Sequence, residues 1–217
     1  MEDYVDDVLK RLSKKYGRML HTQLAHVNLT ELFVAALLSP QCTDKQVNAT
    51  TKELFRRFRS FRDYADSDPA TLRRCLKGIN FYKTKAKHLR SASKEITERF
   101  GGKVPRTLKE LTGLDGVGRK IANVVLSEGH GIDEGIAVDT HVAVTSRRLG
   151  LSMNRDPDRI ESDLMWRIPR KDWGKVNGLF IELGRDTCRA RRKYCERCVL
   201  KDLCPSSTAR DTTTIAV

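Results

Sequence analysis

The stretch Leu114–Lys120 reads Leu-Asp-Gly-Val-Gly-Arg-Lys and interrupts sequence that is otherwise helical on both sides. Glycine permits positive φ and lets the backbone approach a partner closely. A helix that begins near Gly118 would direct its free amide groups and the positive end of its dipole outward, which suits an anion. The stretch therefore predicts a helix–hairpin–helix that contacts phosphates. Its contacting residues would be Gly116, Val117, Gly118 and Arg119. Taken alone, the same residues also fit a plain turn.

A lysine and an aspartate follow this hairpin at positions that could do chemistry. Lys120 falls in the first turn of the second helix, where the helix dipole and Arg119 both repel a cation. Repulsion and burial favour the neutral amine, which is a nucleophile. Asp139 lies in Val-Asp-Thr-His and has the type of an N-cap for a helix over residues 140–148. Its carboxylate could also face an amine, so Lys120 and Asp139 are the candidate catalytic pair.

Four of the six cysteines fall within one short segment with the spacing C-x6-C-x2-C-x5-C. They are Cys188, Cys195, Cys198 and Cys204. In an intracellular chain such a cluster indicates a metal site rather than disulfides. Four thiolates hold either tetrahedral zinc or a [4Fe–4S] cluster, and the spacing leaves both open. Cys42 and Cys75 stand apart and are expected to be ordinary buried cysteines.

The segment between the first two clustered cysteines is strongly basic. It reads Arg-Ala-Arg-Arg-Lys-Tyr over residues 189–194. A metal site would pin both of its ends, so the segment is expected to form a basic finger that contacts phosphate through Arg191, Arg192 and Lys193. A solvated surface is the alternative. The balance of 41 Lys+Arg against 28 Asp+Glu, a formal charge of +13, favours a polyanionic partner.

Helical punctuation recurs along the chain. Capping boxes precede residues 32–38 and 47–58, and Asp68-Pro69 and Asp156-Pro157 place proline at a first helical position. Glycines stand where helices should end, at Gly78, Gly101, Gly102, Gly113, Gly150 and Gly184. About ten short helices are expected, which predicts an all-α fold. From Ser206 the sequence becomes small and polar, so residues 206–217 are expected to be a disordered tail.

A membrane location is not favoured by the sequence. The longest apolar run, residues 32–38, is far shorter than the roughly 20 residues of a spanning helix. The acidic N-terminus lacks the features of a signal or transit peptide. We therefore expect a cytoplasmic, monomeric protein, nucleoid-associated in a prokaryote, with a nuclear location as the alternative.

The hairpin with its lysine, the Val-Asp-Thr-His motif and the four-cysteine spacing, in that order, strongly resemble endonuclease III, the iron–sulfur branch of the helix–hairpin–helix DNA glycosylases. The resemblance runs from about Leu32 to Cys204. It implies a [4Fe–4S] cluster on the four cysteines. It also implies a two-lobed fold with DNA in the cleft between the lobes. Residues 25–135 would form a six-helix lobe, and residues 1–24 with 136–205 would form the cluster lobe.

The resemblance gives roles to residues that would otherwise be passed over. Gln41, in Ser-Pro-Gln-Cys-Thr-Asp, matches the glutamine that fills the space left by an extruded base. Phe81 falls where the family places an apolar wedge beside that gap, which fits the stacking energy that flipping a nucleotide costs. His141, in the motif of Asp139, is counted with the DNA-binding residues. Without the resemblance, Gln41 would be a polar loop residue and Phe81 a core aromatic.

Three positions depart from the family pattern. Asp115 stands where a proline commonly precedes the first hairpin glycine, and Glu134-Gly135-Ile136 replaces a proline before the aspartate. Asn80 replaces a common glycine next to the wedge. None of them touches Lys120 or Asp139, so they bear on affinity and base preference rather than on reaction type.

The resemblance implies a bifunctional enzyme that removes oxidised pyrimidines, such as thymine glycol, from duplex DNA and then nicks the strand at the abasic site. A monofunctional glycosylase acting on mismatched thymine or uracil is one alternative, but it would lack a lysine at position 120. A non-enzymatic metal-bound DNA-binding protein is the other, and it would need neither Lys120 nor Asp139.

Overall fold

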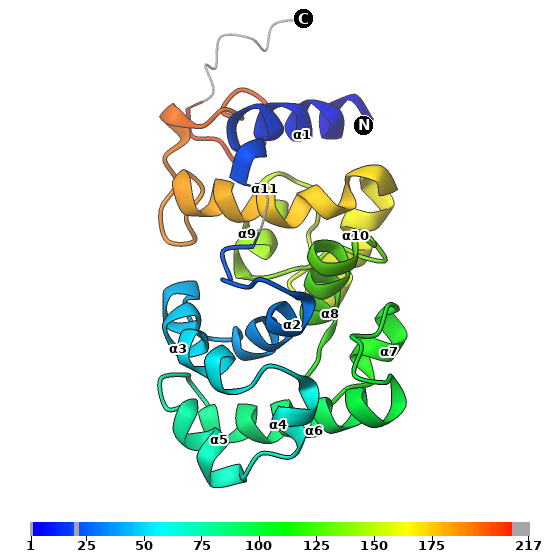
Figure 1. Cartoon of the computed structure of the whole chain (residues 1–217). Helices are drawn as coiled ribbons and strands as arrows, with labels where there is room; N and C mark the ends of the chain where they lie inside the picture. Colours follow the sequence, from blue (N-terminus) through cyan, green and yellow to red (C-terminus); the bar gives the residue numbers. More distant parts are fainter. Residues whose placement is uncertain (1, 20–21, 210–217) are drawn as a thin grey trace, which may run out of the picture. The chain divides into compact units, whose positions relative to one another are not determined.

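The computed structural model describes residues 2–19 and 22–209, and this part of the chain is helical (Figure 1). The α-helices are α1 (Glu2–Tyr16), α2 (Leu29–Leu38), α3 (Asp44–Arg57), α4 (Phe61–Ala65), α5 (Pro69–Cys75), α6 (Tyr82–Arg99), α7 (Leu108–Thr112), α8 (Arg119–Val124), α9 (Thr140–Arg148), α10 (Pro157–Arg167) and α11 (Trp173–Asp186). Short 3-10 helices cover Gly17–Met19 (η1), Arg170–Asp172 (η3) and Cys195–Arg197 (η4), and a π-helix covers Val125–His130 (η2). Over the described ranges the β-structure is one isolated bridge, between Cys188 and Lys193. The all-α prediction is confirmed.

The helices begin where the sequence predicts. Asn28 caps α2 by accepting from Glu31 N, and Glu31 Oε2 accepts from Val27 N. Thr43 caps α3 by accepting from Gln46 N at 3.2 Å. Asp68 and Asp156 cap α5 and α10, each followed by proline at the start of its helix. Because a cap satisfies an amide that the helix itself cannot bond, these side chains set the helix starts locally.

Gly184 is an exception among the glycines expected at helix ends, because it lies inside α11. A Cβ at this position would meet Nδ1 of His141 at 2.8 Å. The glycine therefore lets α9 and α11 approach each other, and its role is packing rather than helix termination.

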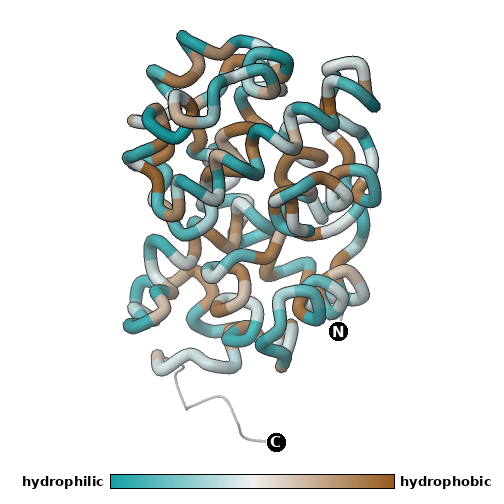
Figure 2. The backbone as a smooth tube through the Cα atoms, turned by 90° about the horizontal axis from the view of Figure 1, so that it is seen from below, coloured by the Kyte–Doolittle hydropathy of each residue, from teal (hydrophilic) through white to brown (hydrophobic). Residues whose placement is uncertain are grey.

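The chain divides into two compact units. The first, which we call the central unit, comprises residues 22–134 and is built from α2 to α8 with η2. Its apolar core takes in α2 from Phe33 to Leu38 and the aromatic pair Phe33 and Phe61, whose ring centroids lie 5.5 Å apart. Hydrophobic and hydrophilic stretches alternate along the tube in Figure 2, as expected for helices that each bury one face.

The second, the terminal unit, joins residues 1–21 to residues 135–217. In it α1 packs against α11, and α11 packs against α9 (Figure 1). Polar contacts tie the first helix to the end of α11: Lys15 Nζ and Tyr16 Oη both donate to Asp186, at 2.7 and 2.8 Å. Arg11 pairs with Asp202 at 2.7 Å. Burial, together with the hydrogen bond to Asp186, raises the pKa of Tyr16 to about 12.

The expected disordered tail does not begin at Ser206. Ser206 O accepts from Lys193 Nζ at 2.7 Å, and Ser207 N donates to Cys204 O at 3.0 Å. Residues 206–209 are therefore part of the folded cysteine segment. The rest of the expected tail, residues 210–217, lies outside the described residues. None of the described helices is both long and apolar enough to span a bilayer.

Candidate functional site

The hairpin forms as predicted, between α7 and α8. Gly113 caps the end of α7, and Gly118 stands at the N-cap of α8. Gly116 has φ +79°, and a Cβ there would lie 2.6 Å from the ring and Cβ of His88 on α6. Glycine is thus required at Gly116 both for the backbone and for space. Val117 is buried and anchors the turn to the core, whereas Gly118 faces open space.

The two cations that follow are placed differently. Arg119 is exposed, while Lys120 is half-buried in the first turn of α8. The side chain of Lys120 is therefore partly shielded from water. It lies at the N-terminal end of α8, where the helix dipole is positive.

Gln41 and Phe81 share an unusual backbone. They are the two non-glycine residues with positive φ in the described ranges, at 56° and 57°. A left-handed residue other than glycine costs about 1–2 kcal/mol and persists when its surroundings hold it there. Both side chains are exposed, and Phe81 keeps 64% of its surface. The interpretation of Phe81 as a core aromatic is wrong.

The three departures from the family pattern each find a partner within the central unit. Asp115 Oδ1 lies 3.6 Å from Nε2 of His88. Glu134 Oε2 accepts from Leu108 N at 3.0 Å. Asn80 Nδ2 donates to Gln41 O at 2.5 Å.

In the terminal unit Asp139 is the N-cap of α9, as predicted. Its Oδ1 accepts from Val142 N at 2.8 Å, and the side chain is half-buried. The residues before it are buried, and Asn177 of α11 donates to Ala137 O at 2.8 Å. The carboxylate is thus held by its own helix and by the segment that leads to it. His141 packs against Gly184 of α11 within the same unit.

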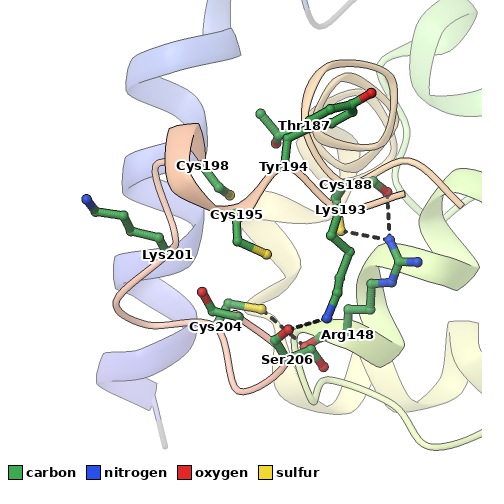
Figure 3. A pocket seen from close by; sticks show the side chains of 11 residues that line it. Arg148, Thr187, Cys188, Lys193, Tyr194, Cys195, Cys198, Lys201, Cys204 and Ser206 are labelled. Carbon is green, nitrogen blue, oxygen red and sulfur yellow. Dashed lines mark hydrogen bonds between the residues drawn. The ribbon is translucent and has the colours of Figure 1, made fainter. Parts of the chain in front are cut away.

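All four clustered cysteines line one cavity (Figure 3). η4 contributes Cys195, and Cys198 caps its end. Arg148 of α9 lies beside the cavity, where Nη1 donates to Cys188 Sγ at 3.3 Å and to Arg189 O at 2.8 Å. Its Nη2 donates to Ala190 O at 2.8 Å. One guanidinium therefore holds both a thiol and the start of the basic segment, a role for Arg148 that the sequence did not signal.

The thiols sit in unequal surroundings. Burial raises the pKa of Cys188, although Arg148 opposes it, and burial also raises the pKa of Cys204. At Cys195 burial acts in the same sense, but hydrogen bonds from Thr208 and Ser207 and the charge of Lys193 outweigh it and lower the pKa. At Cys195 donors and a cation thus favour the thiolate, which is the form that ligates metals, whereas burial favours the thiol at Cys188 and Cys204. Within residues 2–19 and 22–209, no three His, Cys, Asp or Glu side chains converge as ligands of a single ion.

Lys193 differs from the expectation for the basic segment. Its ammonium turns to Ser206 O at the rim of the cavity instead of pointing outward (Figure 3). Arg191 and Arg192 are exposed, and the guanidinium of Arg192 lies 4.9 Å from the ring centroid of Tyr194. The exposed cations of the predicted basic finger are therefore Arg191 and Arg192, because Lys193 bonds Ser206 within the cysteine segment.

Lys85, on α6, was missed by sequence reasoning. It is 7% exposed, and Nζ donates to Leu38 O at 2.7 Å and to Pro40 O at 2.6 Å. Cys42 Sγ lies 3.4 Å from the same nitrogen. Cys42 and Cys75 are half-buried rather than buried. No local pattern marks Lys85, because its partners lie more than forty positions earlier in the chain.

Comparison with known proteins identifies the family of this chain. Residues 34–170 match the family model described as HhH-GPD superfamily base excision DNA repair protein. The chain is 44% identical to endonuclease III of Synechocystis sp., over 82% of both chains. It is 43% identical to endonuclease III of Bacillus subtilis, over 87% of this chain and 86% of that one. It is also similar to a solved structure of a trapped endonuclease III–DNA covalent intermediate, with a TM-score of 0.89 and 36% identity over 95% of this chain and 96% of that one. The chain belongs to the HhH-GPD superfamily and, within it, to the endonuclease III family of base excision repair DNA glycosylases with AP lyase activity.

Proposed function

We propose that this enzyme excises oxidised pyrimidines such as thymine glycol from duplex DNA through Lys120, with Asp139 assisting, and nicks the strand at the resulting abasic site. The observation that carries the proposal is the placement of Lys120, half-buried in the first turn of α8 directly after the hairpin. The similar structure of a trapped covalent intermediate, solved for a protein 36% identical to this one, supports a covalent step.

In the proposed reaction the neutral amine of Lys120 attacks C1′ of the extruded nucleotide. The N–C1′ bond forms as the glycosidic bond breaks, and the bonding electrons leave with the damaged base, which takes up a proton. Asp139 accepts a proton from the amine or stabilises the positive charge that develops on the sugar. Opening of the sugar ring then leaves a Schiff base on Lys120.

Strand cleavage follows from the same intermediate. The iminium acidifies the protons on C2′, and loss of one of them expels the 3′ phosphate by β-elimination. Hydrolysis of the imine returns the free lysine. One residue therefore accounts for both the glycosylase and the lyase steps.

The proposed DNA contacts are distributed over both units. In the central unit the hairpin residues Gly116 to Arg119 would contact DNA phosphates. Gln41 would fill the space left by the extruded base, and Phe81 would insert into the base stack beside it. The exposure of Gln41 and Phe81 supports this assignment. In the terminal unit we propose contacts from His141 and from the exposed Arg191 and Arg192.

We further propose that the four cysteines hold a [4Fe–4S] cluster. They fit it because all four line one cavity with cations and hydrogen-bond donors around it. A cluster of this kind takes one thiolate on each iron, so the sulfurs need to surround a common space rather than one point. When bound, it would cross-link four chain positions and so hold the basic segment in place.

We propose that the enzyme acts as a monomer. The bacterial origin of the relatives named above supports a cytoplasmic enzyme that works on the nucleoid.

The test is borohydride trapping on a thymine-glycol duplex, with the native protein, Lys120→Gln and Asp139→Asn. The native protein should give a covalent protein–DNA band, and Lys120→Gln should give none. Asp139→Asn should slow base release at least about tenfold without loss of the cap of α9, since asparagine caps a helix as well as aspartate. Lys109→Gln is the matched control, because it removes an exposed cation just before the hairpin. A covalent band from Lys120→Gln would disprove the assignment of the nucleophile.

A further inference from the structure

Two residues that flank Phe81 bind the carbonyl groups of the loop that carries Gln41. Lys85 donates to Leu38 O and Pro40 O, and Asn80 donates to Gln41 O. Three carbonyls between positions 38 and 41 are thus bound from either side of position 81. We call this set of contacts the brace.

The brace is itself supported from α3. Gln46 Nε2 donates to Gly78 O at 2.6 Å and to Asn80 Oδ1 at 3.4 Å. The amide of Asn80 is therefore oriented, with its oxygen toward Gln46 and its nitrogen toward Gln41. Lys85, in contrast, is buried, so its ammonium depends on the loop carbonyls for the hydrogen bonds that water would otherwise supply.

The residues that the brace joins are those with strained backbones. Gln41 and Phe81 both adopt left-handed conformations that a free loop would populate poorly. Their side chains remain exposed, so apolar packing of the side chains does not hold them there. What fixes the two backbones relative to each other is the hydrogen bonding between the Gln41 loop and the turn at residues 80–85.

We propose that Asn80 and Lys85 are positioning residues that hold Gln41 and Phe81 ready, before DNA binds, for insertion into the gap that an extruded base leaves. The inference rests on the proposed function, because it takes Gln41 and Phe81 as the residues that enter the duplex. It assigns a purpose to Asn80, the residue that departs from the family's glycine. Pre-organised side chains lose less conformational entropy on binding, so extrusion becomes faster.

The test uses the full-length protein and two probes. One is a thymine-glycol duplex with 2-aminopurine next to the lesion, whose fluorescence rises as the stack opens. The other is a single-stranded oligonucleotide with an abasic site, which has no stack to open and no gap to fill. Asn80→Ala should slow the fluorescence rise on the duplex about tenfold, the size expected when a left-handed residue loses its support. Its loss of cleavage rate on the single strand should be much smaller.

Asn48→Ala is the matched control. Asn48, on α3, also clamps a chain segment with its amide, but it donates to Gln23 O and accepts from Ala25 N rather than bonding the Gln41 loop. It should open the duplex at the native rate. Lys85→Met, which keeps the length and removes the ammonium, should slow extrusion at least as much as Asn80→Ala, and its melting temperature would show whether it folds.

Two outcomes would overturn this proposal. One is a native rate of duplex opening with Asn80→Ala. The other is an equal loss of rate on both probes, which would indicate a general structural defect. Failure of the proposed function looks different. In that case the native protein itself neither opens the duplex nor cleaves either probe, and the brace loses its purpose with it.

Discussion

The central unit is one continuous segment, residues 22–134, whereas the terminal unit joins the start of the chain to its last third. In the central unit α2 lies in the core with every residue from Leu32 to Leu38 buried, and the functional side chains emerge from turns around it. The terminal unit also has an apolar core, to which α1 contributes Val5, Val8 and Leu12, and it adds polar contacts that tie α1 to residues 186 and 202. Apolar packing thus holds both units, and the terminal unit adds specific polar cross-links between two segments that are distant in the sequence.

Removal of one cysteine ligand should have the largest effect and should be confined to the terminal unit. If the four cysteines hold the proposed cluster, Cys198→Ser should lose its visible absorption. Hydrogen-exchange protection of residues 173–209 should fall at least about tenfold, because binding of a metal group by thiolates contributes directly to folding. Exchange measured by mass spectrometry on protein purified without oxygen checks this.

Cys75→Ser is the control for that experiment, since Cys75 belongs to the central unit and lies outside the cavity. If Cys198→Ser lowered the hydrogen-exchange protection of residues 29–134 as much as that of residues 173–209, the contrast between the two units would be contradicted.

The next largest effect concerns the core of the central unit. Phe33 is fully buried and packs edge-on against Phe61, with an interplanar angle of 82°. Phe33→Ala should lower the free energy of unfolding by about 3–5 kcal/mol, because it removes a buried aromatic and leaves a cavity. Urea unfolding measures this, and the half-buried Phe55 provides a milder comparison in Phe55→Ala. A loss no greater than that of Phe55→Ala would show that packing does not dominate this unit.

The smallest effect concerns the polar tie of the terminal unit. Hydrogen bonds from Lys15 and Tyr16 hold the pKa of Asp186 below its ordinary value. A depressed folded-state pKa contributes stability that is present above the unfolded pKa, about 3.9, and is lost as the pH falls through the folded value. Asp186→Asn should therefore cost about 0.5–1 kcal/mol at pH 7, a modest amount because the pair is partly exposed.

The difference in unfolding free energy between native protein and Asp186→Asn should shrink as the pH drops below about 4. Glu53→Gln removes an exposed pair on α3, with Arg56, and should change little at any pH. A difference between native and Asp186→Asn that stays constant down to pH 2 would show that the carboxylate's charge is not what ties α1 to α11.

Local chemistry was readable from the sequence. The caps Asn28, Thr43 and Asp139 each bond an amide three positions ahead, so the pattern of residue types was sufficient to place the helix starts. The hairpin glycine at Gly116 and the spacing of the four cysteines are equally short-range signals. Together they determined the all-α fold and the place of Lys120 in the first turn of its helix, and they predicted the four cysteines as a ligand set.

Only the tertiary structure decided which lysines and amides bond distant parts of the chain. Lys85 looks like any surface lysine of α6, yet it is buried against carbonyls 47 and 45 positions away. Lys193 looks like part of a basic finger, yet it bonds Ser206 and closes the cysteine segment. The amide of Asn80 reaches Gln41, 39 positions earlier. A lysine or an amide carries no mark of its distant partner, because that partner is chosen by how the chain folds back and not by the residues beside it.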